Sequence, residues 1–170
     1  TVSLCAAMLS GCATDWAYIR ASNSDDPETL TQIAMRTRRG GFAINGRTPA
    51  RKAVQRLEDQ DALAQVAMKA TQGEVRSTAV DKLTDQSLLA QVVLEANSPG
   101  DRAAALKKLS DPAQLAAVAR KSDSDSLAKQ AVAALEDAAL LSTVVRESSV
   151  ASVRAAAVAR IEDQEILADL

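Results

Sequence analysis

Apolar residues recur along most of this chain at a fixed spacing of 26 residues. One column of the repeat holds leucine with a final isoleucine, at Leu57, Leu83, Leu109, Leu135 and Ile161. A second column holds Leu63, Leu89, Leu115, Leu141 and Leu167. Alanine fills a third column without exception, at Ala53, Ala79, Ala105, Ala131 and Ala157. A period of this length indicates a stack of repeated supersecondary units.

Each period contains two stretches with helical spacing. Apolar residues three apart predict a first helix over about 74–83. Leu89, Val92 and Val93 give an i, i+3, i+4 stripe, which predicts a second helix over about 86–96. Helices this short are marginally stable by themselves and must pack on neighbours. The repeat therefore predicts an all-α, right-handed α-solenoid of stacked short helix pairs.

The first repeat is incomplete. Segment 26–34 matches segment 111–119 in residue type and spacing, which predicts an N-terminal half-repeat that caps the stack. The next repeat follows seven residues later than the period requires, so an insertion lies within 36–48. The predicted repeat domain spans 26–170.

Aspartates precede the second helix of every repeat, at Asp59, Asp85, Asp111, Asp137 and Asp163. A row of carboxylates suggests metal ligands, but an aspartate at this place is also the preferred N-cap of a helix. Pro27 and Pro112 directly follow Asp26 and Asp111, as expected for an N-cap followed by the first helical residue. We therefore interpret the aspartates as caps and predict no metal site.

The repeats resemble a known family of helical repeats. The segment VRSTAVDKLTDQ (75–86), followed by LLA (88–90), is similar to short HEAT-like repeats of the bacterial type, and the resemblance extends over about 145 of the 170 residues. It implies a concave surface that binds a protein partner. Another short α-repeat, such as the leucine-rich repeat variant, is the alternative.

Two basic columns accompany the aspartates. Arg56, Lys82, Lys108 and Arg160 end the first helix of a repeat, where a cation complements the C-terminal dipole. Arg76, Arg102 and Arg154 lie near the start of that helix. HEAT repeats often hold an Asp–Arg ladder between neighbours, so the resemblance implies that these arginines pair with the aspartates.

The N-terminal segment has a different character. Val2–Leu9 is apolar but far shorter than the roughly 20 residues of a membrane-spanning helix, and it fits the hydrophobic region of a secretion signal. It ends in LSGC (9–12), which resembles the lipobox of bacterial lipoproteins. In that family a peptidase cuts before the cysteine, whose sulfur and new amino group receive acyl chains.

The lipobox resemblance implies a signal peptide remnant over 1–11, lipidation at Cys12 and a tether over 12–25. By analogy with enterobacterial sorting, Ala13 after the cysteine favours the periplasmic face of the outer membrane. The alternative is a buried N-terminal helix with an incidental cysteine.

The insertion concentrates positive charge that no repeat column explains. Its arginines, with an exposed-looking phenylalanine, are Arg36, Arg38, Arg39, Arg47 and Phe42. We interpret them as candidate contacts to anionic lipid headgroups or to an acidic partner. A solvated turn that joins the cap to the first full repeat is the alternative.

Composition narrows the possible functions. The chain has no histidine, only two cysteines and a net charge of −2, and no nucleophile lies beside a candidate base. We therefore expect no catalytic residues, no cofactor, no small-molecule substrate and no nucleic-acid partner. The combined prediction is a lipid-anchored, non-enzymatic scaffold that binds a protein of the cell envelope. The alternatives are an accessory subunit or lyase-like repeat protein that modifies or helps assemble a partner, and a cytoplasmic repeat module.

Overall fold

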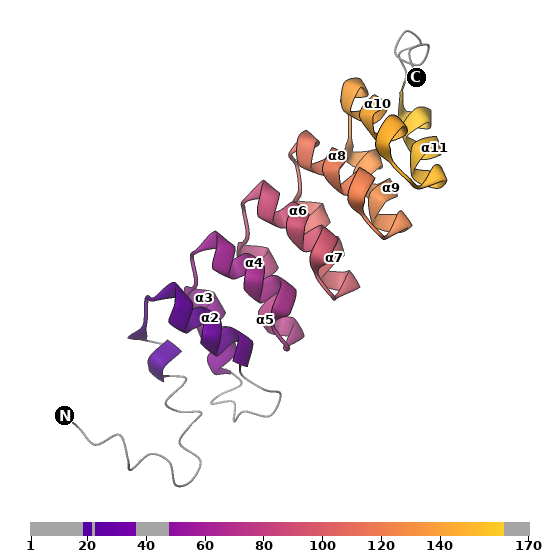
Figure 1. Cartoon of the computed structure of the whole chain (residues 1–170). Coiled ribbons are helices and arrows are strands. Elements are labelled where there is room, and N and C mark those ends of the chain that lie inside the picture. The colour runs from indigo at the N-terminus through magenta and orange to yellow at the C-terminus, as the bar shows by residue number, and fades with distance from the viewer. Residues whose placement is uncertain (1–18, 22, 37–47, 162–170) are drawn as a thin grey trace, which may run out of the picture. The chain divides into compact units, whose positions relative to one another are not determined.

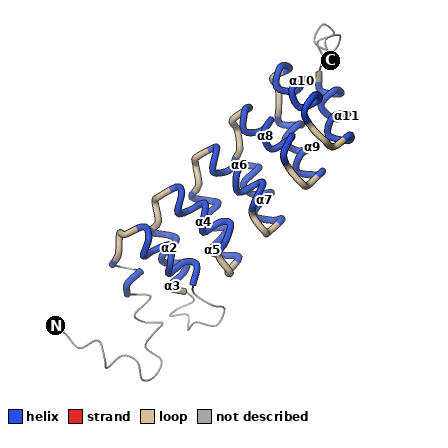
Figure 2. The backbone as a smooth tube through the Cα atoms, viewed as in Figure 1, coloured by secondary structure: helices blue, strands red, loops and turns tan. Residues whose placement is uncertain are grey.

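The structure is a computed structural model, and it describes residues 19–21, 23–36 and 48–161. The longer helices of this part are α2 (Pro27–Arg36), α3 (Pro49–Arg56), α4 (Gln60–Lys69), α5 (Gly73–Lys82), α6 (Gln86–Glu95), α7 (Pro99–Lys108), α8 (Pro112–Lys121), α9 (Asp125–Ala134), α10 (Ala138–Glu147) and α11 (Ala151–Arg160). The described residues contain no strand (Figure 2), so the all-α prediction is confirmed for them.

The lengths of the helices explain the sequence period. From α4 to α11 every helix has ten residues, and three residues separate each helix from the next. Two helices and two connections of these lengths add up to 26 residues. The predicted helices over 74–83 and 86–96 correspond to α5 and α6, and the half-repeat over 26–34 corresponds to α2.

The chain divides after Leu83 into two compact units. In the first unit α2 packs closely on α3, and α4 packs on α5 (Figure 1). In the second unit the closely packed pairs are α6–α7, α8–α9 and α10–α11. Within each unit, equivalent helices of successive pairs also contact each other, as α2 contacts α4 and α8 contacts α10.

The pairing differs from the grouping used for the sequence repeat. That grouping paired a helix such as the one over 74–83 with the helix that follows it, whereas within the second unit the close partners of α7 and α9 are α6 and α8, the helices before them. Both kinds of connection have three residues, so neither periodicity nor loop length reveals which neighbour forms the closer pair. Each closely packed helix pair therefore begins at an aspartate cap.

The apolar residues that recur every 26 positions form the buried core. Six leucines of the two columns are at most 1% exposed, namely Leu57, Leu63, Leu83, Leu89, Leu135 and Leu141, and Leu109 and Leu115 are also buried. All five residues of the alanine column are fully buried. A methyl group at that place lets neighbouring helices approach closely, while the leucines fill the space between them.

Core leucines and adjacent leucines should therefore differ sharply in their contribution to stability. We expect Leu89→Ala to lower the free energy of unfolding by about 2–5 kcal/mol, because it leaves a cavity at a fully buried position. Leu88→Ala, at a partly exposed position in the same turn of α6, is the matched control and should cost much less. Urea unfolding followed by circular dichroism measures both, and equal losses would contradict this view of the core.

Candidate functional site

The column of aspartates serves to begin helices. Asp85 precedes α6, and its Oδ1 accepts hydrogen bonds from the backbone amides of Ser87 and Leu88, at 2.9 and 3.0 Å. The same kind of cap is formed by Asp59, Asp111 and Asp137. The prediction of caps is thus confirmed at four positions, and Asp163 lies outside the described residues. Across the described ranges, no group of three or more residues could hold a metal ion.

Capping also changes the acidity of these carboxyls. The hydrogen bond from the Leu88 amide, together with the hydroxyl of Ser87, lowers the pKa of Asp85 below its ordinary value. The pKa of Asp26, which caps α2, is lowered mainly by hydrogen bonding with Thr29. Both carboxyls are therefore held in the ionised form, which the positive end of the helix dipole stabilises.

Cations at the end of a helix connect successive pairs within a unit. Lys82 Nζ, in α5, donates to the carbonyl of Gln55 in the last turn of α3, at 2.7 Å. Arg160 Nη2, in α11, donates to the carbonyl of Leu135 just after α9, at 2.9 Å. From their positions in the repeat, these cations are predicted to complement a helix C-terminus. The C-terminus that they reach belongs to the equivalent helix of the preceding pair.

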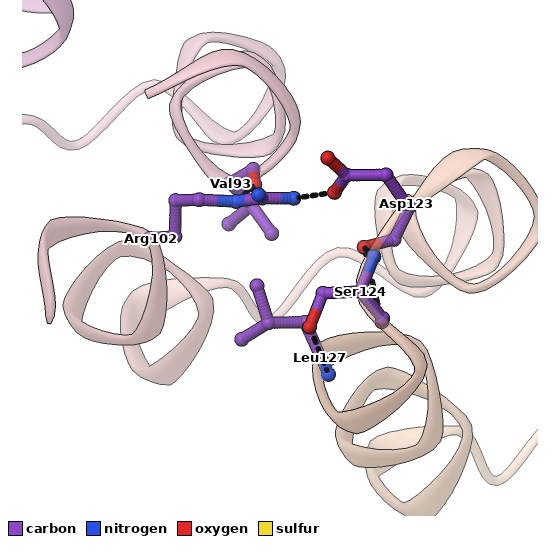
Figure 3. A network of polar contacts seen from close by, with 6 residues as sticks. Val93, Arg102, Asp123, Ser124 and Leu127 are labelled. Carbon is purple, nitrogen blue, oxygen red and sulfur yellow. Dashed lines mark hydrogen bonds and ion pairs between the residues drawn. The ribbon is translucent and has the colours of Figure 1, made fainter. Parts of the chain in front are cut away.

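The second basic column binds backbone carbonyls. Arg102 Nε, in α7, donates to the carbonyl of Val93 in α6, at 2.6 Å, and its guanidinium pairs with Asp123 in the turn between α8 and α9 (Figure 3). Arg76 and Arg154 donate to carbonyls at the turn that precedes their own helix. The carboxylate partner of Arg102 does not belong to the aspartate column, so the expected pairing with that column is wrong for this residue. Every cap aspartate already faces the amides of its own helix.

A hollow of about 500 Å³ opens in the first unit between the start of α2 and the connection from α3 to α4. It is lined by Asp25, Pro27, Leu30, Gln55, Arg56, Leu57, Glu58 and Asp59. Arg56 Nε donates to the carbonyl of Ser24 at 3.1 Å, and its guanidinium pairs with Asp25. Three carboxylates and one guanidinium give the hollow a negative balance, which favours neutral or positively charged groups. No motif of the sequence had pointed to this hollow.

Basic residues continue from the insertion into α3. Thr48 caps this helix, and Arg51 and Lys52 follow within its first turn. The Arg51 side chain is exposed, and Lys52 is partly exposed. Positive charge near the insertion thus includes a helical segment that the prediction had not counted.

Five of the six predicted site residues fall outside the part of the chain that the structure describes. Cys12, Arg38, Arg39, Phe42 and Arg47 lie outside the described residues. Arg36 is the last residue of α2, and its side chain is not described. The closely packed α2 and α3 bring the two ends of the insertion to the same helix pair.

Comparisons with protein-family models, with curated proteins and with solved structures found no match. None of the described helices is both long and apolar enough to cross a membrane.

The lowered pKa of Asp85 makes its contribution to stability depend on pH. A carboxyl with a depressed folded-state pKa stabilises the fold above its unfolded-state pKa, near 3.8, and this stabilisation is lost as the pH falls through the folded-state value. We expect Asp85→Ala to lower the urea midpoint at neutral pH, and the difference from the wild type to shrink on acidification. Asp85→Asn keeps a capping oxygen and should lose less. A difference that grows on acidification would contradict this account.

The two bonds of Arg102 can be separated by mutation. Arg102→Ala removes the donor to a carbonyl in the core and should lower the free energy of unfolding by about 1–3 kcal/mol. Asp123→Ala removes only the partner whose side chain is 76% exposed, so a smaller loss is expected. Urea titrations of both variants test this order. Equal effects would show that the ion pair, rather than the Val93 carbonyl, dominates.

Proposed function

We propose that this chain is a non-enzymatic, lipid-anchored scaffold of the bacterial cell envelope, which binds a partner protein through a right-handed, HEAT-like helical repeat. The anchor is Cys12, and the location is the periplasmic face of the outer membrane. The repeat supplies the binding surface, and no chemical step is assigned to it.

The observation that supports this proposal best is the repetition of one helix pair. Each 26-residue repeat adds two ten-residue helices, whose buried leucines and alanines pack against neighbouring helices. The polar groups at the helix ends are used in caps and in bonds between pairs. Adding pairs therefore extends an exposed surface at a constant internal structure, and stacks of this kind are suited to binding extended partners.

The membrane part of the proposal follows from the lipobox and from the basic residues that come after it. Several acyl chains on Cys12 would provide stable anchoring, because each buried methylene contributes about 0.8 kcal/mol. The arginines of the insertion, followed by Arg51 and Lys52 in α3, would add about 1 kcal/mol each when close to an anionic surface. A short tether keeps these groups near the headgroups.

Anchoring is tested in a bacterial host with the natural gene. The variant Cys12→Ser should lose the mobility shift that acylation causes, and it should leave the membrane fraction for the soluble fraction. Cys5→Ser changes a cysteine outside the lipobox and is the matched control. Retention of Cys12→Ser in the membrane without any change in mobility would overturn the anchoring proposal.

Partner binding is tested separately by crosslinking and capture from envelope extracts, with the wild type and with a variant that lacks residues 36–47. The wild type should recover a specific envelope protein. Loss of that protein in the deletion variant would assign its contact to the insertion, and its retention would assign the contact to the helix pairs. Recovery of no specific protein by either chain would remove the support for a scaffold.

A further inference from the structure

The first residue after each aspartate cap varies along the chain. Among the described residues these are Pro27, Gln60, Gln86, Pro112 and Ala138. In the second unit, the Gln86 side chain reaches the connection between α7 and α8. Its Oε1 accepts hydrogen bonds from the backbone amides of Ser110 and Asp111, at 2.7 and 3.0 Å. Its Nε2 donates to the carbonyl of Lys108, at 3.5 Å. One carboxamide thus satisfies two donors and one acceptor of the connection.

The hollow of the first unit lies at the corresponding place. Pro27 stands where the second unit has Gln86, and the connection from α3 to α4 presents the same backbone groups. The equivalents of Lys108, Ser110 and Asp111 are Arg56, Glu58 and Asp59. Proline carries no carboxamide. Among the described residues, the amides of Glu58 and Asp59 have no acceptor.

We propose that this hollow receives the side-chain carboxamide of a glutamine from a partner polypeptide, in the way that the second unit holds Gln86. The oxygen of the carboxamide accepts from the amides of Glu58 and Asp59, and its NH₂ group donates to the carbonyl of Arg56. This inference rests on the proposed protein-binding function and names the chemistry that one site of the scaffold recognises.

The charges around the hollow make the recognition selective. A glutamate side chain has nearly the same shape, but its negative charge would face Asp25, Glu58 and Asp59, and it has no NH₂ group for the carbonyl of Arg56. A lysine fits the charge but cannot accept from the two amides. Only a group with both an acceptor and a donor matches the connection, and a primary carboxamide has both.

A single substitution can fill the hollow from within the chain. Pro27→Gln places a carboxamide where Gln86 lies in the second unit, and glutamine is already accepted at this position after two other caps. The variant should therefore fold and close the site. Pro112→Gln makes the same change at the start of α8, away from the hollow, and is the matched control.

The experiment is an NMR titration of the ¹⁵N-labelled chain with the acetylated, amidated tripeptide Ala-Gln-Ala. Saturable shifts of the Glu58 and Asp59 amides are expected, with a dissociation constant on the order of 1–10 mM, since only a few hydrogen bonds form. The tripeptide Ala-Glu-Ala should cause no such shifts. Pro27→Gln should weaken binding about tenfold or more, and Pro112→Gln should leave it unchanged.

Three results would overturn the proposal. The first is the absence of shifts at both amides up to the solubility limit of the glutamine peptide. The second is an equal response to the glutamate peptide, or an undiminished response of Pro27→Gln. The third is strong hydrogen-exchange protection of both amides in the free chain, which would mean that the chain fills the hollow itself. Because the titration uses no envelope partner and no membrane, its failure is separate from a failure of the fractionation or capture experiments.

Discussion

Burial of aliphatic side chains between neighbouring short helices is the constraint on which the other features of each unit depend. A ten-residue helix has too few internal hydrogen bonds to be stable in water by itself. With no aromatic residue after Phe42, the repeats are packed by leucine, isoleucine, valine and alanine alone. Fully buried leucines such as Leu63 and Leu89 supply the apolar contact, and the small side chain of Ala79 allows the helices to come close enough for it. A single pair lacks neighbours on both sides, so stability accumulates only when pairs stack.

Short helices create a second requirement, because they have many ends. Each end leaves backbone groups without partners inside the helix. The chain meets this requirement with side chains at fixed places in the repeat: an aspartate such as Asp85 accepts from the N-terminal amides, and a cation such as Lys82 donates to the C-terminal carbonyls of the preceding pair. The second kind of bond links two pairs, so satisfying a helix end also fixes how successive pairs are placed within a unit.

The difference between contacts within one helix and contacts between helices explains which features the sequence could predict. Helix positions, the buried columns and the role of Asp85 follow from local spacing, and local spacing is visible in one chain. The closer partner of α7 was not predictable, since both of its connections have three residues. The partner of Arg102 was misassigned because Asp123 is 21 residues away, in a turn that belongs to no regular column. The hollow could not be predicted either, because it forms where the start of α2 and the connection that follows α3 come together. The one signal of the hollow in the sequence is that Pro27 follows the aspartate cap where other repeats have a glutamine.

That exchange shows how a repeat can acquire a specific site without a change of fold. The cap, the leucines and the three-residue connection are kept from pair to pair, so the backbone amides at Glu58 and Asp59 correspond to those at Ser110 and Asp111. Where the first helical residue is Gln86, the chain satisfies its own connection. Where it is Pro27, the residues of the corresponding connection line an open hollow. Neither Gln86 nor Pro27 belongs to the buried core, so this position is free to vary. In the proposed site, that variation leaves backbone donors and an acceptor for another molecule.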